Sequence, residues 1–389
     1  MSREFDIIVY GATGFTGQLV AEYLVQHQGD GPIRWAMAGR SLTKLQEVRS
    51  AIGAPADLPL IAANADDPAA LKAMVARASV VITTVGPYQL YGEPLLAACA
   101  EAGTAYVDLC GEPAWMRQMI DKYDAAAANS GARIVFSCGF DSIPFDLGVH
   151  TLQEAARAKF GRPAPRVKCR IRVMKGTFSG GTFASAKATM AAAARDPGTF
   201  KLLLDPFALT PGFRGPDQPK GMLPEYDPAV GGWVAPFIMA TINTKNVHRT
   251  NALLDHAYGT DFVYDEMVVA GLGDMGKAAA EALAKLNPMA GDKGPKPGEG
   301  PSREEREAGH YDILFIGEMA DGARVEAVVT GDRDPGYGST SKMIAQSALC
   351  LLRDVPVEGN GGVRTAGGLM AEPLRKRLID HAGLTFTAG

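Results

Sequence analysis

Several features that mark special classes of protein are missing from this 389-residue sequence. It contains no run of about eighteen apolar residues, so a membrane-spanning helix is not expected. Its five cysteines include no CxxC pair and its six histidines lack ligand spacing, which argues against a disulfide framework and a metal site. Its net charge of −4 offers no basic surface for a nucleic acid.

The remaining composition is typical of a soluble globular protein. Hydrophobic residues make up 47% and charged residues 21%, and the length favours two domains. The first residues include no apolar signal segment, so we expect a cytoplasmic protein. The expected partner is a small molecule, and the composition is compatible with a homodimer and with peripheral contact with a membrane.

A glycine-rich turn near the start predicts a nucleotide-binding fold. Residues 11–17 read Gly-Ala-Thr-Gly-Phe-Thr-Gly, after an apolar run at 5–10 and before a helical pattern at 18–28. In this strand–turn–helix context, glycines permit the sharp turn and the close approach of the backbone to a pyrophosphate. The positive end of the helix then faces the phosphates.

The end of the next strand indicates which nucleotide binds. The apolar segment 33–38 predicts a second strand, at whose end NAD-preferring folds carry an acidic residue for the ribose 2′-hydroxyl. Here Gly39, Arg40 and Ser41 occupy that place, and an arginine pairs with a 2′-phosphate instead. We therefore predict NADP(H). The alternative is that Arg40 only covers the adenine and leaves the choice of coenzyme open.

Strands alternate with helices as far as about residue 145. This alternation predicts an α/β fold with a doubly wound parallel sheet of the Rossmann type. Further strands of this sheet are expected at 58–64, 79–85, 105–109 and 133–138.

After Asp146 the pattern changes to that of an α+β substrate domain, 147–338, with a mostly antiparallel sheet. Its strands are expected at 167–173, 235–242, 311–319 and 323–330. A helix at 339–353 should return the chain to the first domain, so the predicted NADP-binding Rossmann domain comprises 1–146 and about 339–389. The linker-like segment 287–307 is interpreted as a mobile surface loop, with a lid as the alternative.

Candidate site residues follow the strands of the first domain, because open α/β sheets bind ligands outside the carboxyl ends of their strands. Tyr88 or Tyr91 would project toward the nicotinamide, with plain packing as the alternative. Asp141 could contact substrate or tune a proton transfer, with helix capping as the alternative. The predicted catalytic residues are Tyr88 and Asp141. The predicted cofactor-binding residues are Gly11, Thr13, Gly14, Phe15, Thr16, Gly17, Arg40, Ser41, Asp66, Val85, Gly86 and Pro87.

The pair of residues that protonates a carbonyl oxygen in short-chain dehydrogenases is absent, because no tyrosine has a lysine four residues later. Hydride transfer with another proton source stays open, since the cofactor carries the difficult chemistry. The sequence does not identify that source. Glu112 precedes Pro113 and is interpreted as an acid at the start of a helix, with a role at the site as the alternative.

Short motifs in a fixed order resemble the saccharopine dehydrogenase-like oxidoreductases, including the bacterial trans-acting enoyl reductases. The similarity covers nearly the whole chain and rests on residues 10–17, 38–41, 85–88, 137–144, 178–182, 251–254, 297–302, 361–365 and 372–374. It implies a Rossmann domain, a substrate domain inserted after the sixth strand, and a C-terminal segment that rejoins the first domain. It also implies NADP(H) and, for some members, reduction of a carbon–carbon double bond in lipid biosynthesis.

The leading hypothesis is an NADPH-dependent oxidoreductase that reduces an apolar, lipid-like enoyl or carbonyl substrate by hydride transfer. Aromatic and methionine residues in the middle segment suit an apolar ligand better than one with several carboxylates, although core packing also explains them. One alternative is a saccharopine-type dehydrogenase acting on a C–N bond of an amino-acid adduct, which three convergent arginines would favour. Another is a non-enzymatic NADP-binding sensor or interaction module.

Overall fold

The apolar strand segments of the first domain pair in parallel, as their alternation with helices predicts. The structure is a computed structural model that describes residues 3–27, 31–177, 180–286 and 298–389. Seven parallel strands form the first sheet in the order β13-β6-β5-β4-β1-β2-β3. Their bounds are β1 Phe5–Tyr10, β2 Trp35–Gly39, β3 Leu60–Ala62, β4 Ala78–Thr83, β5 Ala105–Val107, β6 Arg133–Val135 and β13 Gly362–Arg364.

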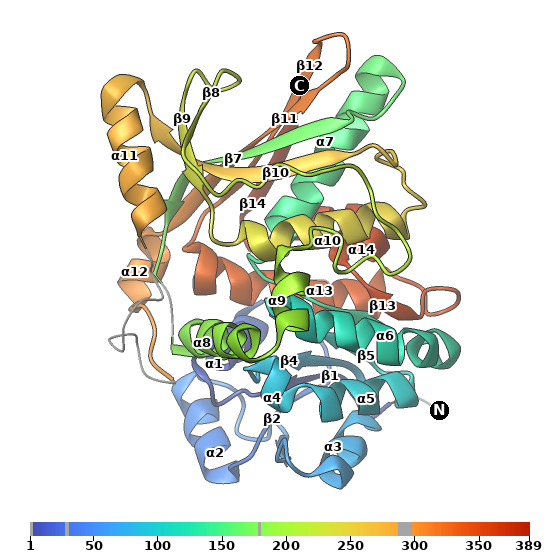
Figure 1. Ribbon diagram of the computed structural model, residues 1–389. Helices are drawn as coiled ribbons and strands as arrows, with labels where there is room; N and C mark the ends of the chain where they lie inside the picture. The colour runs from blue at the N-terminus through green and yellow to red at the C-terminus, as the bar shows by residue number, and fades with distance from the viewer. Residues whose placement is uncertain (1–2, 28–30, 178–179, 287–297) are drawn as a thin grey trace.

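Helices cover both faces of this sheet, which makes the predicted doubly wound fold (Figure 1). The chain runs from β1 outward to β3 and then starts again at β4 on the other side of β1, so the carboxyl ends of β1 and β4 flank a crevice. One face carries α1 Phe15–Gln26, α2 Leu42–Ala51 and α13 Thr340–Arg353. The other carries α3 Pro68–Val75, α5 Glu93–Ala102 and α6 Pro113–Ser130.

The second sheet has the order β14-β12-β11-β7-β10-β9-β8, and every neighbouring pair except β7 and β10 is antiparallel. This confirms the predicted mostly antiparallel sheet. Its strands are β7 Arg166–Lys175, β8 Glu225–Asp227, β9 Gly232–Pro236, β10 Val263–Gly271, β11 His310–Glu318, β12 Arg324–Gly331 and β14 Leu384–Ala388.

Three long helices lie between the two sheets and join their cores. They are α7 Ile143–Phe160, α10 Ala240–Leu253 and α14 Ala366–Ala382. The remaining helices are α4 Tyr88–Tyr91, α8 Gly180–Arg195, α9 Pro197–Leu204, α11 Gly273–Lys285, α12 Arg303–Ala308 and the π-helix Pro335–Ser339. After residue 339 the chain supplies a strand to each sheet, β13 to the first and β14 to the second. The predicted domain limits therefore stay a prediction.

The expected strand at 235–242 is wrong in its second half. Strand β9 ends at Pro236, and α10 begins at Ala240. A short apolar run cannot distinguish a strand from a buried helix by its periodicity. Strand β10 was missed because Asp265 and Glu266 interrupt its apolar pattern, although both side chains are buried in the fold.

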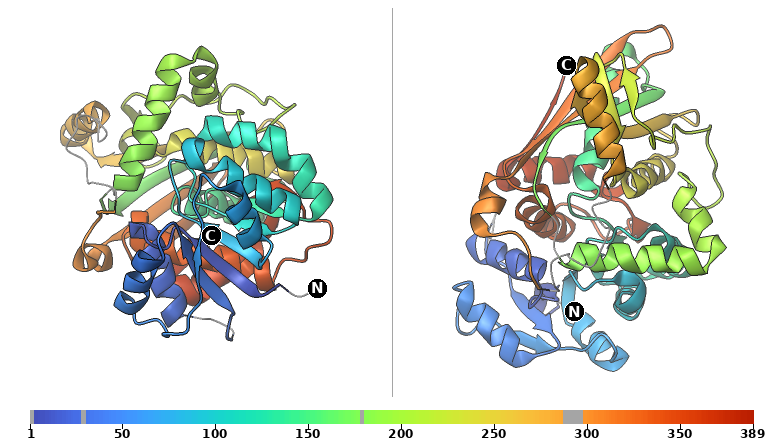
Figure 2. Two further views of the ribbon diagram at one scale, coloured as in Figure 1. Left: turned by 90° about the horizontal axis from the view of Figure 1, so that it is seen from below. Right: turned by 60° about the vertical axis from the view of Figure 1, so that its left-hand side comes forward.

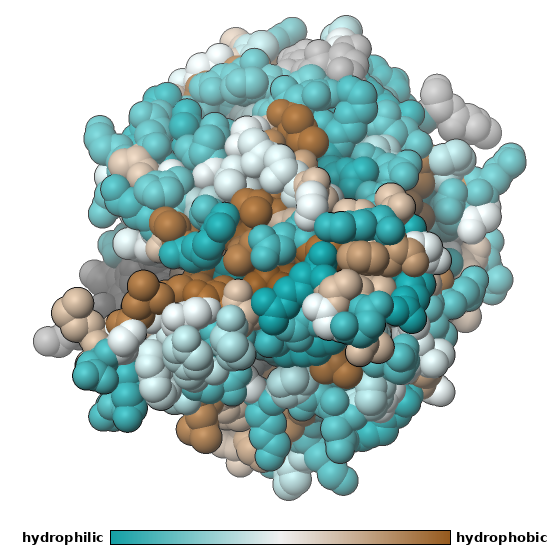
Figure 3. Space-filling view, turned by 90° about the horizontal axis from the view of Figure 1, so that it is seen from above, coloured by the Kyte–Doolittle hydropathy of each residue, from teal (hydrophilic) through white to brown (hydrophobic). Residues whose placement is uncertain are grey.

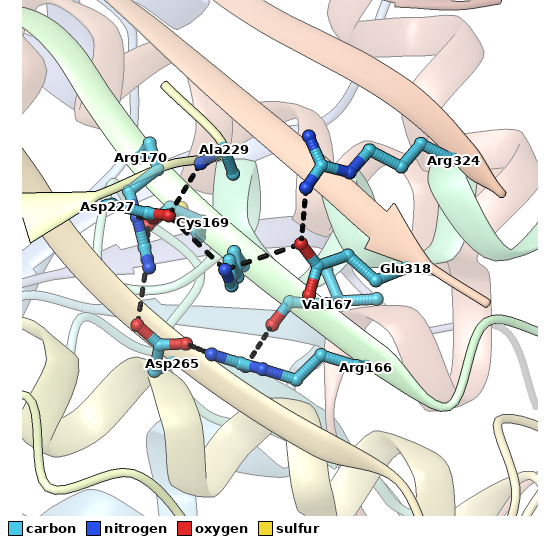
Figure 4. A network of polar contacts seen from close by, with 10 residues as sticks. Arg166, Val167, Cys169, Arg170, Asp227, Ala229, Asp265, Glu318 and Arg324 are labelled. Atoms are coloured by element: carbon cyan, nitrogen blue, oxygen red, sulfur yellow. Dashed lines mark hydrogen bonds and ion pairs between the residues drawn. The ribbon is translucent and has the colours of Figure 1, made fainter. Parts of the chain in front are cut away.

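Buried ion pairs explain the charged residues of β7, whose alternation predicted a face exposed to water. Arg170 is 1% exposed, and its guanidinium contacts Asp227 at 2.6 Å and Asp265 at 2.8 Å. Lys168 lies 3.2 Å from the same Asp227 and 3.3 Å from Glu318. Figure 4 shows the contacts of Arg170 with Asp227 and Asp265. A buried charge is tolerated because it is paired, so this face is dry around Arg170 and exposed at Arg172 and Met174.

The surface over the second sheet is mostly hydrophilic, with a band of hydrophobic residues across its centre (Figure 3). Exposed apolar side chains of this domain include Val173 and Met174 on β7 and Leu272 and Met275 at the start of α11. Within the described residues, no helix has the length and apolarity needed to span a membrane.

Candidate functional site

The turn between β1 and α1 forms a cradle that only glycine can build. Gly11 has a φ of +87°, and a Cβ there would lie 2.7 Å from the Val85 side chain. A Cβ on Gly17 would lie 2.1 Å from the Gly11 carbonyl oxygen. Gly14 precedes α1 without any side-chain cap, so the first N–H groups of this helix stay available to a phosphate.

Two charged residues follow the strands next to the cradle and act on the same hydroxyl, that of Tyr10. Arg40 follows β2 and is exposed, and Asp66 follows β3. Burial raises the pKa of Tyr10 to about 12, and the charge of Asp66 raises this pKa further while that of Arg40 lowers it. Both charges therefore lie close to the Tyr10 hydroxyl. Ser41 caps α2 by accepting a hydrogen bond from the Lys44 N–H at 3.3 Å.

Glu112 fixes the turn that follows β4, where the nicotinamide ribose is expected. Its carboxylate accepts hydrogen bonds from the backbone N–H groups of Tyr88 at 2.9 Å and Gln89 at 2.8 Å. It is 3% exposed and makes no side-chain cap on its own helix, α6. This geometry fits the alternative in which Glu112 has a role at the site, and not the interpretation of Glu112 as an acid at the start of a helix. The sequence contained one signal for this role of Glu112. The backbone N–H groups of Tyr88 and Gln89, which follow Pro87 at the start of α4, need a hydrogen-bond acceptor.

The Tyr88 side chain is 5% exposed and lies under the same turn. Its hydroxyl donates to the Thr83 carbonyl at 3.2 Å and accepts from the Leu109 N–H at 3.1 Å. Burial raises the pKa of this hydroxyl well above its ordinary value. A catalytic role for Tyr88 stays a prediction, and these bonds favour positioning of the turn against β5.

Replacing Tyr88 by Phe should therefore lower stability more than turnover. The variant leaves the buried N–H of Leu109 without its acceptor, which costs about 1–3 kcal/mol. Urea unfolding and steady-state kinetics on the same preparation separate the two effects. A large loss of kcat in a protein of unchanged stability would instead give the hydroxyl a chemical role.

Helix α8 lies beside this turn (Figure 2). A Cβ on Gly86 would lie 3.4 Å from the Ser185 hydroxyl oxygen, and Gln89 Nε2 lies 3.4 Å from Thr189 Oγ1. Near the pyrophosphate turn, Gly300 packs so closely on the Phe15 ring that a Cβ would come within 2.4 Å of it. The end of the predicted loop 287–307 thus covers the cradle, while residues 287–297 lie outside the described residues.

Asp141 follows β6 at the same edge of the sheet and is partly buried. Desolvation raises the pKa of its carboxyl to about 7, and no described residue donates a hydrogen bond to it. The next residue, Ser142, accepts a hydrogen bond from Asn246 of α10 at 2.8 Å. Asp141 is therefore a carboxyl that can carry a proton near neutral pH.

Two other buried carboxyls near this edge have structural partners. Asp108 accepts hydrogen bonds from the Tyr106 hydroxyl and from the backbone of Cys110 and Ser137, and burial raises its pKa to about 7. It ties the end of β5 to the end of β6. Asp146 accepts from the Gly367 N–H at 2.7 Å, which joins α7 to α14.

Together these features define a class: a Rossmann-type dinucleotide-binding protein with a glycine cradle after β1, an exposed arginine after β2 and a carboxyl of raised pKa after β6. Residues 7–135 match the family model of the saccharopine dehydrogenase NADP binding domain. The cofactor is accordingly NADP(H), as Arg40 predicted.

Relatives along the whole chain give the family. A Mycobacterium tuberculosis protein, named provisionally as a trans-acting enoyl reductase, is 44% identical over 97% of this chain and 96% of its own. The trans-acting enoyl reductase of Mycobacterium bovis is 41% identical over the same shares. The chain belongs to the trans-acting enoyl reductase family and is an NADP-dependent oxidoreductase.

Solved structures share the fold alone, at low sequence identity. Saccharopine dehydrogenase (L-Glu forming) from Saccharomyces cerevisiae matches with a TM-score of 0.54 and 12% identity over 99% of both chains. The homospermidine synthase of Legionella pneumophila, in complex with NAD, matches with a TM-score of 0.53 and 10% identity over 99% of this chain and 91% of its own. The predicted α/β fold with a second sheet domain is confirmed.

Proposed function

We propose that the protein uses NADPH to reduce a carbon–carbon double bond conjugated to a carbonyl in an apolar substrate. The observation that carries this proposal is the Asp141 carboxyl at the same edge of the sheet as the nucleotide cradle, because this reduction needs one proton donor as well as one hydride. The names of the relatives support the same reaction.

The arginines of the middle segment speak against the saccharopine-type alternative. Arg170 is bound to Asp227 and Asp265 within the second sheet, and Arg172 lies 2.6 Å from Asp312. These two guanidinium groups are already committed to protein carboxylates. A substrate with several carboxylates would need free arginines that converge on one pocket.

The chain's own residues have the following proposed roles. The backbone of the 11–17 turn binds the pyrophosphate, and Arg40 with Ser41 binds the 2′-phosphate, beside Asp66. Residues 85–87 flank the nicotinamide, from which NADPH supplies the hydride. Asp141 gives its proton to the carbon α to the carbonyl while the hydride adds to the β-carbon. One NADPH and one proton are consumed for each double bond.

The test is an NADPH-oxidation screen over enoyl thioesters, enones, and keto acids offered with amines. We expect turnover with long-chain enoyl compounds and none with keto acids and amines. Turnover of the amino-acid adducts would give the saccharopine-type reaction, and tight NADPH binding without any turnover would contradict an enzymatic role.

A homodimer in the cytoplasm completes the proposal. The hydrophobic band over the second sheet offers an apolar surface for a second copy (Figure 3). All five cysteines are free thiols, as expected in a reducing compartment. Light scattering on the purified protein measures the mass directly, and a monomer at micromolar concentration would contradict the dimer.

A further inference from the structure

A second protonatable carboxyl lies in the substrate domain. Glu266 of β10 is 1% exposed. Its two oxygens accept hydrogen bonds from the Tyr264 hydroxyl at 2.8 Å and from Asn243 Nδ2 at 3.0 Å. Among the described residues no ion pair with a cation is formed by this group, and burial raises its pKa to about 8. Glu266 is thus held in place by neutral partners and can keep its proton at neutral pH.

Helix α10 brings Glu266 next to the Asp141 turn. Asn243 binds Glu266, and Asn246, three residues later on the same face, donates to Ser142 at 2.8 Å. The two carboxyls interact electrostatically, since the charge of Asp141 raises the pKa of Glu266. One carboxyl therefore follows β6 of the first sheet, the other lies on β10 of the second, and α10 connects them.

Two buried amide oxygens lie along the same path. Asn243 and Asn246 are 0% and 2% exposed, and neither Oδ1 has a hydrogen-bond partner among the described residues. Each can accept from an O–H group, which is the arrangement that holds water between two acids. The other titratable groups that act on Glu266 are Tyr264, Cys169 and Asp265. Of these, Asp265 is committed to its ion pairs with Arg166 and Arg170.

We propose that Glu266 and Asp141 form a carboxyl pair that retains a proton in the site, with Glu266 returning a proton to Asp141 after each reduction. Glu266 is a positioning residue, because it acts through Asp141 and not on substrate. Asp141 loses its proton to the α-carbon, regains one from Glu266, and Glu266 is reprotonated from solvent. This inference rests on the proposed function for its chemistry, but the pair itself exists without substrate.

The first test needs no substrate. In difference infrared spectroscopy of the wild type between pH 5 and 10, the protonated carboxyl bands of Asp141 and Glu266 should titrate in linked steps, beside separate bands from the other buried carboxyls, Asp108 and Asp146. The Glu266 band should disappear in Glu266→Gln, and the Asp141 band, identified by its loss in Asp141→Asn, should then titrate at lower pH. The matched control is Glu318→Gln, which removes a partly exposed carboxyl from β11 and should leave the bands of Asp141 and Glu266 unchanged. Unlinked titration, or no change in Glu266→Gln, would overturn the proposal.

The second test measures kcat against pH with any substrate the protein reduces. The wild type keeps a proton on the carboxyl pair as pH rises. Glu266→Gln should therefore lose activity at a pH about one unit lower than the wild type does. At pH 6 the kcat of the variant should nearly match that of the wild type. Glu266→Asp keeps a carboxyl and should restore part of the activity at high pH. This variant keeps the proposal testable if Glu266→Gln folds poorly. An equal loss of kcat at every pH in Glu266→Gln would mean that Glu266 has only a packing role. If the infrared bands are linked but no enoyl compound is reduced, the proposed function is contradicted and the carboxyl pair of Asp141 and Glu266 is still supported.

Discussion

Arg40→Asp should raise the Kd for NADPH by about 100-fold and leave the Kd for NADH nearly unchanged. Arg40 follows β2 at the edge of the crevice and is exposed, so the 2′-phosphate can reach it. A charge-assisted bond to phosphate contributes about 1.5–3 kcal/mol, which corresponds to about 10- to 150-fold in affinity. The new carboxylate would also repel the phosphate, whereas NADH carries a hydroxyl there.

Quenching or enhancement of nicotinamide fluorescence on titration measures both constants. A suitable control is Arg34→Asp, which reverses a charge at the opposite end of β2, where Arg34 pairs with Asp6. That variant should bind both coenzymes like the wild type. Equal losses of NADPH and NADH affinity in Arg40→Asp would mean that Arg40 only covers the adenine.

The second large effect concerns the proton donor. Asp141→Asn should lower kcat by about 100- to 10,000-fold and leave the Kd for NADPH unchanged, because the amide cannot give up a proton to the substrate carbon. The pKa of Asp141 is raised to about 7 and the protonated form is the active one. Wild-type kcat should therefore fall as pH rises through this value, and the residual rate of the variant should not.

Asp146→Asn is the matched comparison for this experiment. Its carboxyl is also buried at the start of α7, and burial raises its pKa to about 6, but it accepts a hydrogen bond from the Gly367 backbone. The substitution should lower the free energy of unfolding and spare kcat. If Asp141→Asn keeps its turnover, or if Asp146→Asn loses as much, another group donates the proton.

The cofactor cradle could be predicted because its determinants are local. Glycines at 11, 14 and 17, an apolar strand before them and a helix after them lie within about twenty residues, and Arg40 follows the next strand. The alternating strands and helices likewise predicted the parallel sheet. Strand β10 escaped because Asp265 and Glu266 break its apolar pattern, and only their partners in other strands and helices explain their burial.

The acidic residues of the site also divide into those that neighbouring residues predict and those that only tertiary contacts explain. Asp141 was predicted as a site residue because it follows a predicted strand, whereas Glu112 was interpreted as a helix-start acid and Glu266 was not considered. Glu112 binds backbone N–H groups more than twenty residues earlier in the chain, and Glu266 reaches Asp141 through α10 and across two domains. No pattern of neighbouring residues records such contacts.

The sequence alone determined the nucleotide fold and the choice of NADP(H), because turn geometry and the charge at one strand end depend on adjacent residues. The tertiary structure decided which carboxyls are dry and which of them lie together. Burial and charge interaction set the protonation of an acid, and both depend on groups that only folding brings close. The cradle could therefore be predicted from residues 11–41, whereas the burial of Asp141 and Glu266 and the contacts that link them through α10 are properties of the whole fold.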